Sequence, residues 1–331
     1  MPKEEQKSEV FWDPVGEKIT HGQFASDRKK LEQTLEKYQK NPTGVRKNAL
    51  IFSVPAVATI VWIVLNPSII ATLAELTKDG DGVFLLFLPF VLIALYIGYI
   101  FRVQRQLVKI LVAKTQGWVF APSDHQYKRG GYITKKYPEI SQYDPAILHE
   151  EFWGSILYKR KKINFWIGAF IVISTKQWRN RGCINTVFAL PLDKKLSSNF
   201  QLEPEGIKLK LFNNFFRSNK NEEIDTESID FNASYTVFYN GRKIDNQIEI
   251  VKVLSPSVQT RLINLSRKWK CTIIFREDVV LFSLKGRFLS WWRMKTNFFR
   301  KVELDPRDQK MLEDQISEFA QISSDITRFL D

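Results

Sequence analysis

The chain has 331 residues, of which 44% are hydrophobic, and its 49 Lys and Arg outnumber its 36 Asp and Glu to give a net charge of +13. This length allows one large domain, or a membrane segment plus one domain of about 200 residues. Only two cysteines, Cys183 and Cys271, are present without a Cys-x-x-Cys pair, which argues against a disulfide scaffold and a Cys-based metal site.

Residues 1–47 predict a cytoplasmic N-terminal segment that begins disordered and polar. It has no apolar stretch or cleavage site of the kind that marks a signal peptide. From Ser26, the spacing of Leu31, Leu35 and Tyr38 by four and three residues predicts an amphipathic helix.

Residues 48–102 predict a transmembrane hairpin. The runs 49–65 and 83–101 contain no charged residue, and a spanning helix needs about 17–25 mostly apolar residues. Lys and Arg flank both runs, while the connector is acidic, so the positive-inside rule places both termini in the cytoplasm. The prediction is a multi-pass protein of the cell (inner) membrane; two buried helices of a soluble core are the alternative.

Residues 103–331 predict a cytoplasmic α+β domain, so the expected fold class is α+β: a two-helix transmembrane hairpin plus a mainly antiparallel β domain with flanking helices. A helix is expected to run past residue 103 and to end at Gly117, before an irregular stretch over 122–143. Asp144-Pro145, Ser255-Pro256 and Asp305-Pro306 each predict a helix start. Strands are predicted over 154–158, 165–173, 184–190, 207–212, 235–239, 248–253, 271–275 and 279–284.

Four short segments carry a family resemblance. They are residues 181–188, 226–232, 235–238 and 253–256, which read RGCINTVF, TESIDFN, YTVF and VLSP. Together with the paired apolar runs, they resemble a widespread bacterial family of two-span membrane proteins with a domain of unknown function. The resemblance implies the two-span architecture and a bacterial membrane location, and it implies no reaction, cofactor or substrate.

The most distinctive candidate site is the aromatic and basic segment 287–301. Its predicted membrane-interface residues are Arg287, Trp291, Trp292, Arg293, Lys295, Phe298, Phe299 and Arg300. Aromatic rings and cations together favour the headgroup region of an anionic lipid bilayer. A core-packed excursion and a stacking platform for single-stranded nucleic acid are the alternatives.

Catalytic signatures are missing from the sequence. His21, His125 and His149 belong to no metalloprotease or triad motif, and no phosphate-binding glycine loop occurs. The acidic residues between Glu222 and Asp230 lack the spacing of a calcium loop and suggest a solvated linker. No catalytic residue, cofactor or metal is therefore predicted.

The leading hypothesis is a membrane-anchored, non-enzymatic module whose cytoplasmic domain binds a partner protein or a lipid. Its expected partners are a lipid bilayer with anionic headgroups, a protein, and a second copy in a homo-oligomer, with nucleic acid disfavoured. A membrane-bound enzyme with an unrecognised site is the first alternative, and an oligomeric channel is the second.

Overall fold

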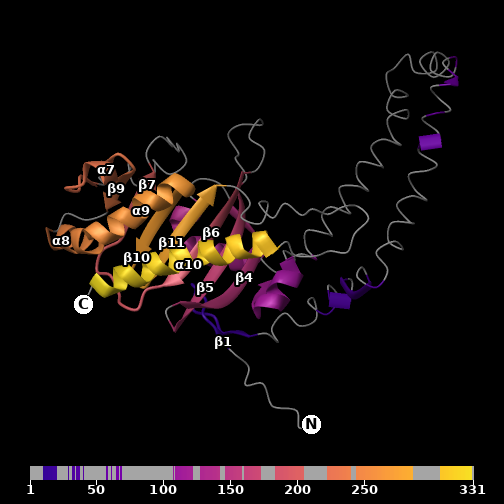
Figure 1. Ribbon diagram of the computed structural model, residues 1–331, viewed down its shortest axis with the longest axis horizontal. Helices are drawn as coiled ribbons and strands as arrows, with labels where there is room; N and C mark the ends of the chain where they lie inside the picture. The colour runs from indigo at the N-terminus through magenta and orange to yellow at the C-terminus, as the bar shows by residue number, and fades with distance from the viewer. Residues whose placement is uncertain are drawn as a thin grey trace, which may run out of the picture. The chain divides into compact units, whose positions relative to one another are not determined.

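A computed structural model gives the fold of the chain (Figure 1). It describes residues 10–20, 109–121, 127–141, 146–158, 160–172, 183–204, 222–239, 244–285 and 306–329, together with isolated positions between residues 29 and 107. The chain divides into two compact units: one comprises residues 1–25, 113–293 and 306–331, and the other residues 26–112 and 294–305. All the labelled helices and strands named below belong to the first unit.

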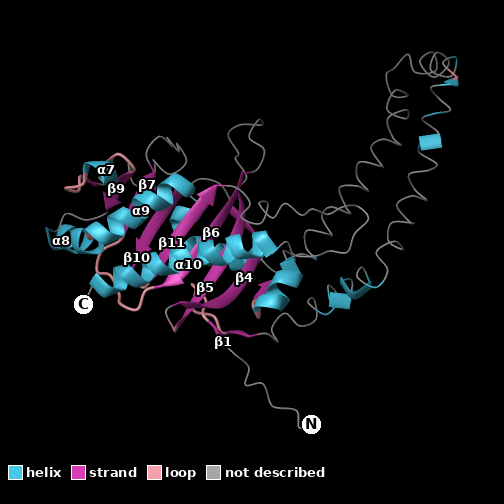
Figure 2. Cartoon of the chain, viewed as in Figure 1, coloured by secondary structure: helices cyan, strands magenta, loops and turns pink. Residues whose placement is uncertain are grey.

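A nine-stranded antiparallel sheet forms the centre of this unit (Figure 2). Its strand order is β3-β4-β5-β6-β11-β10-β7-β9-β8. The strands are β3 (Val119–Ala121), β4 (Ala146–Tyr158), β5 (Lys161–Val172), β6 (Cys183–Pro191), β7 (Phe200–Pro204), β8 (Glu222–Ile224), β9 (Tyr235–Tyr239), β10 (Cys271–Arg276) and β11 (Val279–Lys285). A separate pair, β1 (Val10–Phe11) and β2 (Ile19–Thr20), forms a small antiparallel hairpin.

Helices accompany the sheet. They are α5 (Tyr127–Lys136), the 3-10 helix η2 (Pro138–Ser141), α7 (Ile229–Asn232), α8 (Ile244–Val253), α9 (Pro256–Lys268) and α10 (Pro306–Phe329). Helices α9 and α10 lie over one face of the sheet (Figure 1). The ring of Phe319 on α10 stacks on Phe282 at a centroid distance of 4.4 Å and meets the edge of Phe188 at 4.9 Å.

The opposite face of the sheet carries a second apolar core. Trp153 and Trp166 of β4 and β5 are fully buried in it, together with Leu281 of β11. Phe11 and Ile19 of the small hairpin join the same cluster, so this core holds residues 10–20 in place. Burial of apolar surface is the main favourable contribution to such an arrangement.

Several local predictions are confirmed. The helix over residues 109–116 ends at Gly117, whose φ of +69° and the hydrogen bond from Trp118 N to Ala113 O at 2.8 Å form a Schellman cap. Helix α9 starts at Pro256, and β10 and β11 pair as a hairpin. Helix α10 starts at Pro306 as predicted, and its residues Ile316, Phe319, Ile322 and Ile326 are buried at helical spacing.

The helix predicted after Asp144-Pro145 is wrong, because residues 146–158 form strand β4. A β-bulge between Leu148 and Glu150 adds His149 to the strand and shifts the alternation of side chains. The break in period two hid the strand, and the cap-like Asp-Pro pair suggested a helix. Pairing with β3 on one side and β5 on the other outweighs that local preference.

Three further predictions are corrected. Residues 248–253 belong to helix α8, in which Ile250, Val253 and Leu254 are buried at helical spacing, so packing overrides the β preference of the sequence. The stretch 122–143 contains α5 and η2. Residues 10–20, expected to be disordered, form the β1–β2 hairpin because Phe11 and Ile19 reach the sheet core.

The predicted fold class is also corrected. In the part of the chain that the structure describes, no helix combines the length and the apolar character needed to cross a membrane. The fold is mixed α/β with a nine-stranded antiparallel sheet, and the prediction of a transmembrane hairpin over 48–102, with its inner-membrane location, is withdrawn. The prediction relied on the length of an apolar run, about 17–25 residues for a membrane span. That length does not by itself make the folded chain form one continuous helix over the run. Run 83–101, and all but a few positions of run 49–65, lie outside the described residues. The predicted boundaries at 47 and 102 stay predictions.

The paired glycines of α5 provide a test of helix packing. A Cβ on Gly130 would lie 3.0 Å from Leu148 Cβ and 3.3 Å from Leu148 N, whereas a Cβ on Gly131 would meet nothing within 4 Å. We expect Gly131→Ala to raise the free energy of unfolding by about 0.5–1 kcal/mol, because alanine favours helix. Gly130→Ala has the same helical benefit, yet we expect a net loss of about 1–3 kcal/mol through overpacking. Urea unfolding of both variants tests this, and shifts in the same direction would contradict it.

Candidate functional site

The aromatic and basic segment predicted to contact lipid lies outside the described residues. The residues concerned are Arg287, Trp291, Trp292, Arg293, Lys295, Phe298, Phe299 and Arg300. Their assignment to a membrane interface stays a prediction.

The histidines and the acidic cluster provide no reaction centre in the described structure. His149 lies in β4 instead of a helix, while His21 and His125 fall outside the described residues. Glu223 and Asp225 are exposed along or just after edge strand β8, so this acidic stretch is part of the fold and not a linker. No group of three His, Cys, Asp or Glu side chains among the described residues is placed to hold a metal ion.

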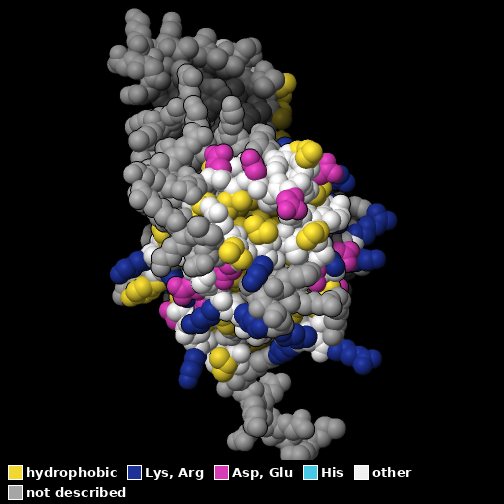
Figure 3. Space-filling model, turned by 90° about the vertical axis from the view of Figure 1, so that its left-hand side faces the viewer, with side chains coloured by type: hydrophobic (Ala, Val, Ile, Leu, Met, Phe, Trp, Pro, Cys, Tyr) yellow, Lys and Arg dark blue, Asp and Glu magenta, His cyan; other side chains and the backbone are white. Residues whose placement is uncertain are grey.

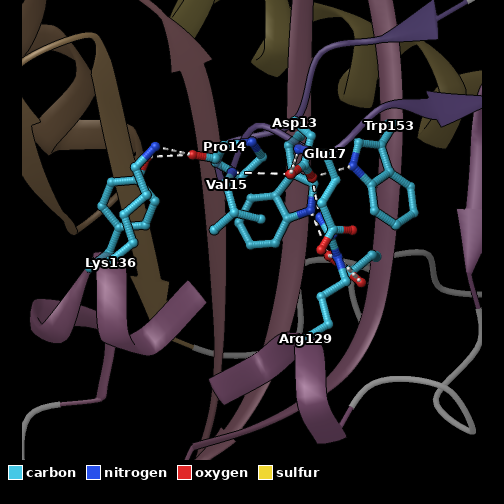
Figure 4. A network of polar contacts seen from close by, with 10 residues as sticks. Asp13, Pro14, Val15, Glu17, Arg129, Lys136 and Trp153 are labelled. Atoms are coloured by element: carbon cyan, nitrogen blue, oxygen red, sulfur yellow. Dashed lines mark hydrogen bonds and ion pairs between the residues drawn. The ribbon is translucent and has the colours of Figure 1, made fainter. Parts of the chain in front are cut away.

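A network of charged side chains lies where residues 10–20, here called the strap, cross the sheet (Figure 4). The turn of the strap is organised by Asp13, whose Oδ2 accepts hydrogen bonds from Val15 N at 3.0 Å and Glu17 N at 3.2 Å. Such side chain to backbone bonds are typical of aspartate in turns. They leave Oδ1 of Asp13 directed at the sheet, where Trp153 Nε1 donates to it at 2.9 Å.

Arg129 of α5 is the centre of this network. Its Nε donates to both carboxylate oxygens of Glu151, at 2.7 and 2.9 Å, and its Nη1 donates to Glu17 Oε2 at 2.5 Å. Its Nη2 pairs with Asp13 Oδ1. The guanidinium also lies 5.1 Å from the centre of the Trp153 ring. One cation thus serves three carboxylates, two of which have fully buried side chains, Asp13 and Glu151.

Burial and ion pairing shift the pKa values of Glu151 and Arg129 in opposite directions. Desolvation raises the pKa of Glu151 to about 7 from its ordinary 4.5, even though the charge of Arg129 and hydrogen bonds from Arg129 and Trp166 lower it. For Arg129, desolvation lowers the pKa, and attraction to Glu151, Asp13 and Glu17 outweighs it, so that the pKa is raised. The cluster therefore keeps its cation, while Glu151 titrates near neutrality.

A carboxyl group with a pKa near 7 has the acidity of a general acid or base, but catalysis also requires contact with a substrate. Glu151 has no exposed surface, and its oxygens accept hydrogen bonds from Arg129 and from Trp166 Nε1 at 2.9 Å. The described geometry suits a structural clamp that fastens the strap to the sheet.

A second set of contacts holds the strap at Pro14. The backbone oxygen of Pro14 accepts hydrogen bonds from Lys136 Nζ at 2.5 Å and from Tyr137 Oη at 2.9 Å (Figure 4). Beside it lies an open hollow of about 470 Å³ lined by Val15, Glu17, Tyr132, Lys135 and Lys136. Because it is open and holds charges of both signs, this hollow is a poor candidate for an enclosed ligand site.

A concentration of exposed basic side chains lies at one end of the sheet. We call it the basic end: Arg160, Lys161, Lys162, Lys194 and Lys195, all exposed. The strand register places the β4–β5 turn and the loop after β6 at the same end. Lys161 pairs with Asp193 of that loop, which joins the two segments.

Exposed acidic side chains also lie at this end: Asp193 is in the loop after β6, and Glu277 and Asp278 form the β10–β11 turn, whose backbone oxygens accept hydrogen bonds from that loop. Glu223, Asp225, Glu227 and Asp230 are exposed along β8 and α7, at the sheet edge farthest from β3 in the strand order. In Figure 3, Lys and Arg side chains predominate over the lower part of the face shown. Among these exposed residues, the basic end has five cations against three carboxylates, whereas β8 and α7 carry four carboxylates.

The network of charged side chains around Arg129 was not predicted from the sequence. Asp13, Arg129 and Glu151 are separated by 116 and 22 positions, and no motif links them. A usable signal was the adjacent pair Glu150-Glu151 within a segment that has strand-forming residues, since one of two neighbouring strand residues must face the core. The basic residues 159–162 are apparent in the sequence, but their position at the end of a sheet is not.

Comparisons with known proteins add little. No family model and no curated protein matches the chain. The chain is similar to the crystal structure of the mycobacterial trehalose monomycolate transport factor A, with 12% identity and a TM-score of 0.39 over 69% of this chain and 94% of that one. A likeness of this size carries no argument about function. The expected resemblance to the two-span bacterial family stays a prediction.

Proposed function

We propose that the sheet unit is a non-enzymatic module that binds anionic lipid headgroups through its basic end. The observation that carries the proposal is the gathering of five exposed cations on two segments at one end of the sheet, where they outnumber the exposed carboxylates Asp193, Glu277 and Asp278. Lys and Arg near an anionic lipid surface each contribute about 1 kcal/mol of attraction.

Lipid is favoured over other polyanions by what surrounds the cations. Leu157, in the strand that leads into the turn, is 77% exposed, and the turn follows it directly. An apolar side chain beside cations suits the boundary between headgroups and acyl chains. Recognition of single-stranded nucleic acid relies on several exposed aromatic rings. Among the described residues 156–163 and 192–199, the one aromatic side chain is that of Tyr158, which is half-buried.

Cosedimentation of the full chain with lipid vesicles tests the proposal. We expect binding to vesicles of phosphatidylcholine mixed with phosphatidylglycerol, weaker binding to phosphatidylcholine alone, and a loss of the difference at high salt. The double variant Lys162→Glu/Lys195→Glu should weaken binding to the anionic vesicles at least about tenfold.

The matched control reverses two exposed cations at the other end of β10, Arg267→Glu/Lys270→Glu, and should bind like the unaltered chain. All variants share residues 26–112, so any contribution of that segment cancels in the comparison. Equal binding to both kinds of vesicle, or equal loss in both double variants, would refute the proposal.

A further inference from the structure

The β4–β5 hairpin extends beyond the rest of the sheet. Strand β3 pairs with β4 only as far as Trp153, and β6 pairs with β5 only from Trp166 onwards. Among the described strands, residues 154–158 and 161–165 therefore pair only with each other. We call these residues the ribbon; at 3.3 Å per residue it is roughly 13 Å long.

The base of the ribbon is tightly packed. A Cβ on Gly154 would lie 2.5 Å from the Phe165 ring and 2.6 Å from the Trp118 ring, so only glycine fits there without rearrangement. Trp118 and Phe165 meet edge to face at 4.9 Å and 84°. This packing anchors the base of the ribbon against Trp118, and Lys161 near its tip pairs with Asp193 of the loop after β6.

The tip of the ribbon exposes an apolar side chain next to a cation. Leu157 pairs directly with Lys162 across the hairpin, so both side chains lie on one face of the ribbon. Single exposed leucines are common on protein surfaces and mean little by themselves. This leucine differs because it lies near the tip of a hairpin that extends beyond its neighbouring strands, next to exposed cations.

The turn itself holds a second unusual residue. Tyr158 pairs with Lys161, so two residues make the turn, and the second, Arg160, has a φ of +65°. Tight hairpin turns with positive φ favour Gly, Asn or Asp, because other side chains crowd the backbone there. A strained residue at an exposed tip is a reason to look for a function of its side chain.

We infer that the ribbon tip is the point of insertion into an anionic lipid surface, with Leu157 entering the acyl boundary and Arg160 and Lys162 contacting headgroup phosphates. The inference rests on the proposed function and names its contact residues. Arginine suits this position because its guanidinium forms paired hydrogen bonds with phosphate oxygens. Phosphate binding by its guanidinium then accounts for an arginine, instead of glycine, at the positive φ of position 160.

Two substitutions test the inference on the full chain, with phosphatidylcholine vesicles containing phosphatidylglycerol. Leu157→Ser should weaken binding about tenfold to a hundredfold, the amount expected from the burial of one leucine side chain. Val251→Ser, which changes an apolar side chain on α8 that is 56% exposed, is the matched control and should leave binding unchanged.

Arg160→Gly separates ligand binding from turn formation. We expect it to raise Tm by about 2–4 °C, because glycine accepts positive φ, and to weaken binding about fivefold. Arg160→Lys should retain most of the binding without the gain in Tm.

If the unaltered chain binds both kinds of vesicle equally, the proposed function fails and the inference fails with it. If it prefers anionic vesicles but Leu157→Ser and Arg160→Gly bind as tightly as the unaltered chain, only the ribbon tip is excluded. A rise in Tm for Arg160→Gly with unchanged binding would likewise overturn the role assigned to Arg160.

Discussion

Replacement of Arg129 by Met is expected to lower the free energy of unfolding by about 3–5 kcal/mol at neutral pH. The substitution keeps most of the side-chain volume and removes the cation that Asp13, Glu17 and Glu151 share. Two of these carboxylates have no exposed surface, so they would be left buried without a counter-ion. Removal of one partner from a buried ion pair is costly for this reason.

Urea unfolding of the full chain at neutral pH gives the measurement. The control is Arg261→Met, which breaks the ion pair with Asp325 in a site where Arg261 is 36% exposed. Solvent reaches this pair and screens it, so it should contribute less than the buried cluster, about 1 kcal/mol. Equal losses in Arg129→Met and Arg261→Met would show that the buried cluster has no special role in stability.

A double variant tells whether the loss comes from uncompensated charge or from lost packing. If charge is the cause, Glu151→Gln should restore part of the stability of Arg129→Met, because it removes one of the unpaired carboxylates. If packing is the cause, the two losses should simply add.

The second large effect is a fall in stability as pH rises. Desolvation holds the pKa of Glu151 near 7 in the folded chain, against 4.5 for the ordinary group. Between these values the folded state binds more protons than the unfolded state, so the free energy of unfolding decreases as pH increases. Glu151 thus contributes full stability below pH 4.5, and roughly 3 kcal/mol of it is lost by the time the pH passes 7.

Glu151→Gln tests this assignment. The variant keeps an acceptor for Arg129 and Trp166 but cannot titrate, so the fall in stability between pH 5 and pH 8 should be much smaller than in the unaltered chain. Glu249→Gln is a control of opposite sign. Although desolvation raises the pKa of Glu249, hydrogen bonds from Ser197 and Ser198 lower it overall, so its contribution is present above the ordinary pKa and lost in acid. Parallel pH profiles for Glu151→Gln and the unaltered chain would exclude Glu151 as the group responsible.

The elements that the sequence predicted well are those whose signals are local. Helix α10 has a proline at its start and a four-three apolar stripe, and α9 has the same two features. The β10–β11 hairpin joins two runs of β-branched and aromatic residues across three polar residues. In each case the spacing of apolar residues along the sequence matched the period of the helix or strand that formed, so neighbouring residues were enough for the prediction.

The failures occurred where distant contacts outweighed local preference. The bulge at His149 is defined by the pairing of β4 with β5, which the sequence does not show. Gly130 in α5 is needed because Leu148 of β4 lies close to it. The sequence predicted a disordered strap because it has few apolar residues. Two of them, Phe11 and Ile19, stabilise it only by packing into the core of the sheet. The apolar runs over 49–65 and 83–101 led to a membrane assignment that no described helix supports.

By itself, the sequence determined the net positive charge, the basic run at the β4–β5 turn and the helices and hairpin with a clear apolar period, because these depend on neighbouring residues. Only the tertiary structure decided that Leu157 and Arg160 stand at the end of a projecting ribbon, and that Arg129 meets three carboxylates. The physical reason is that burial and charge pairing depend on distances between residues far apart in the chain. Desolvation then turns an ordinary glutamate, Glu151, into a group that titrates near neutral pH.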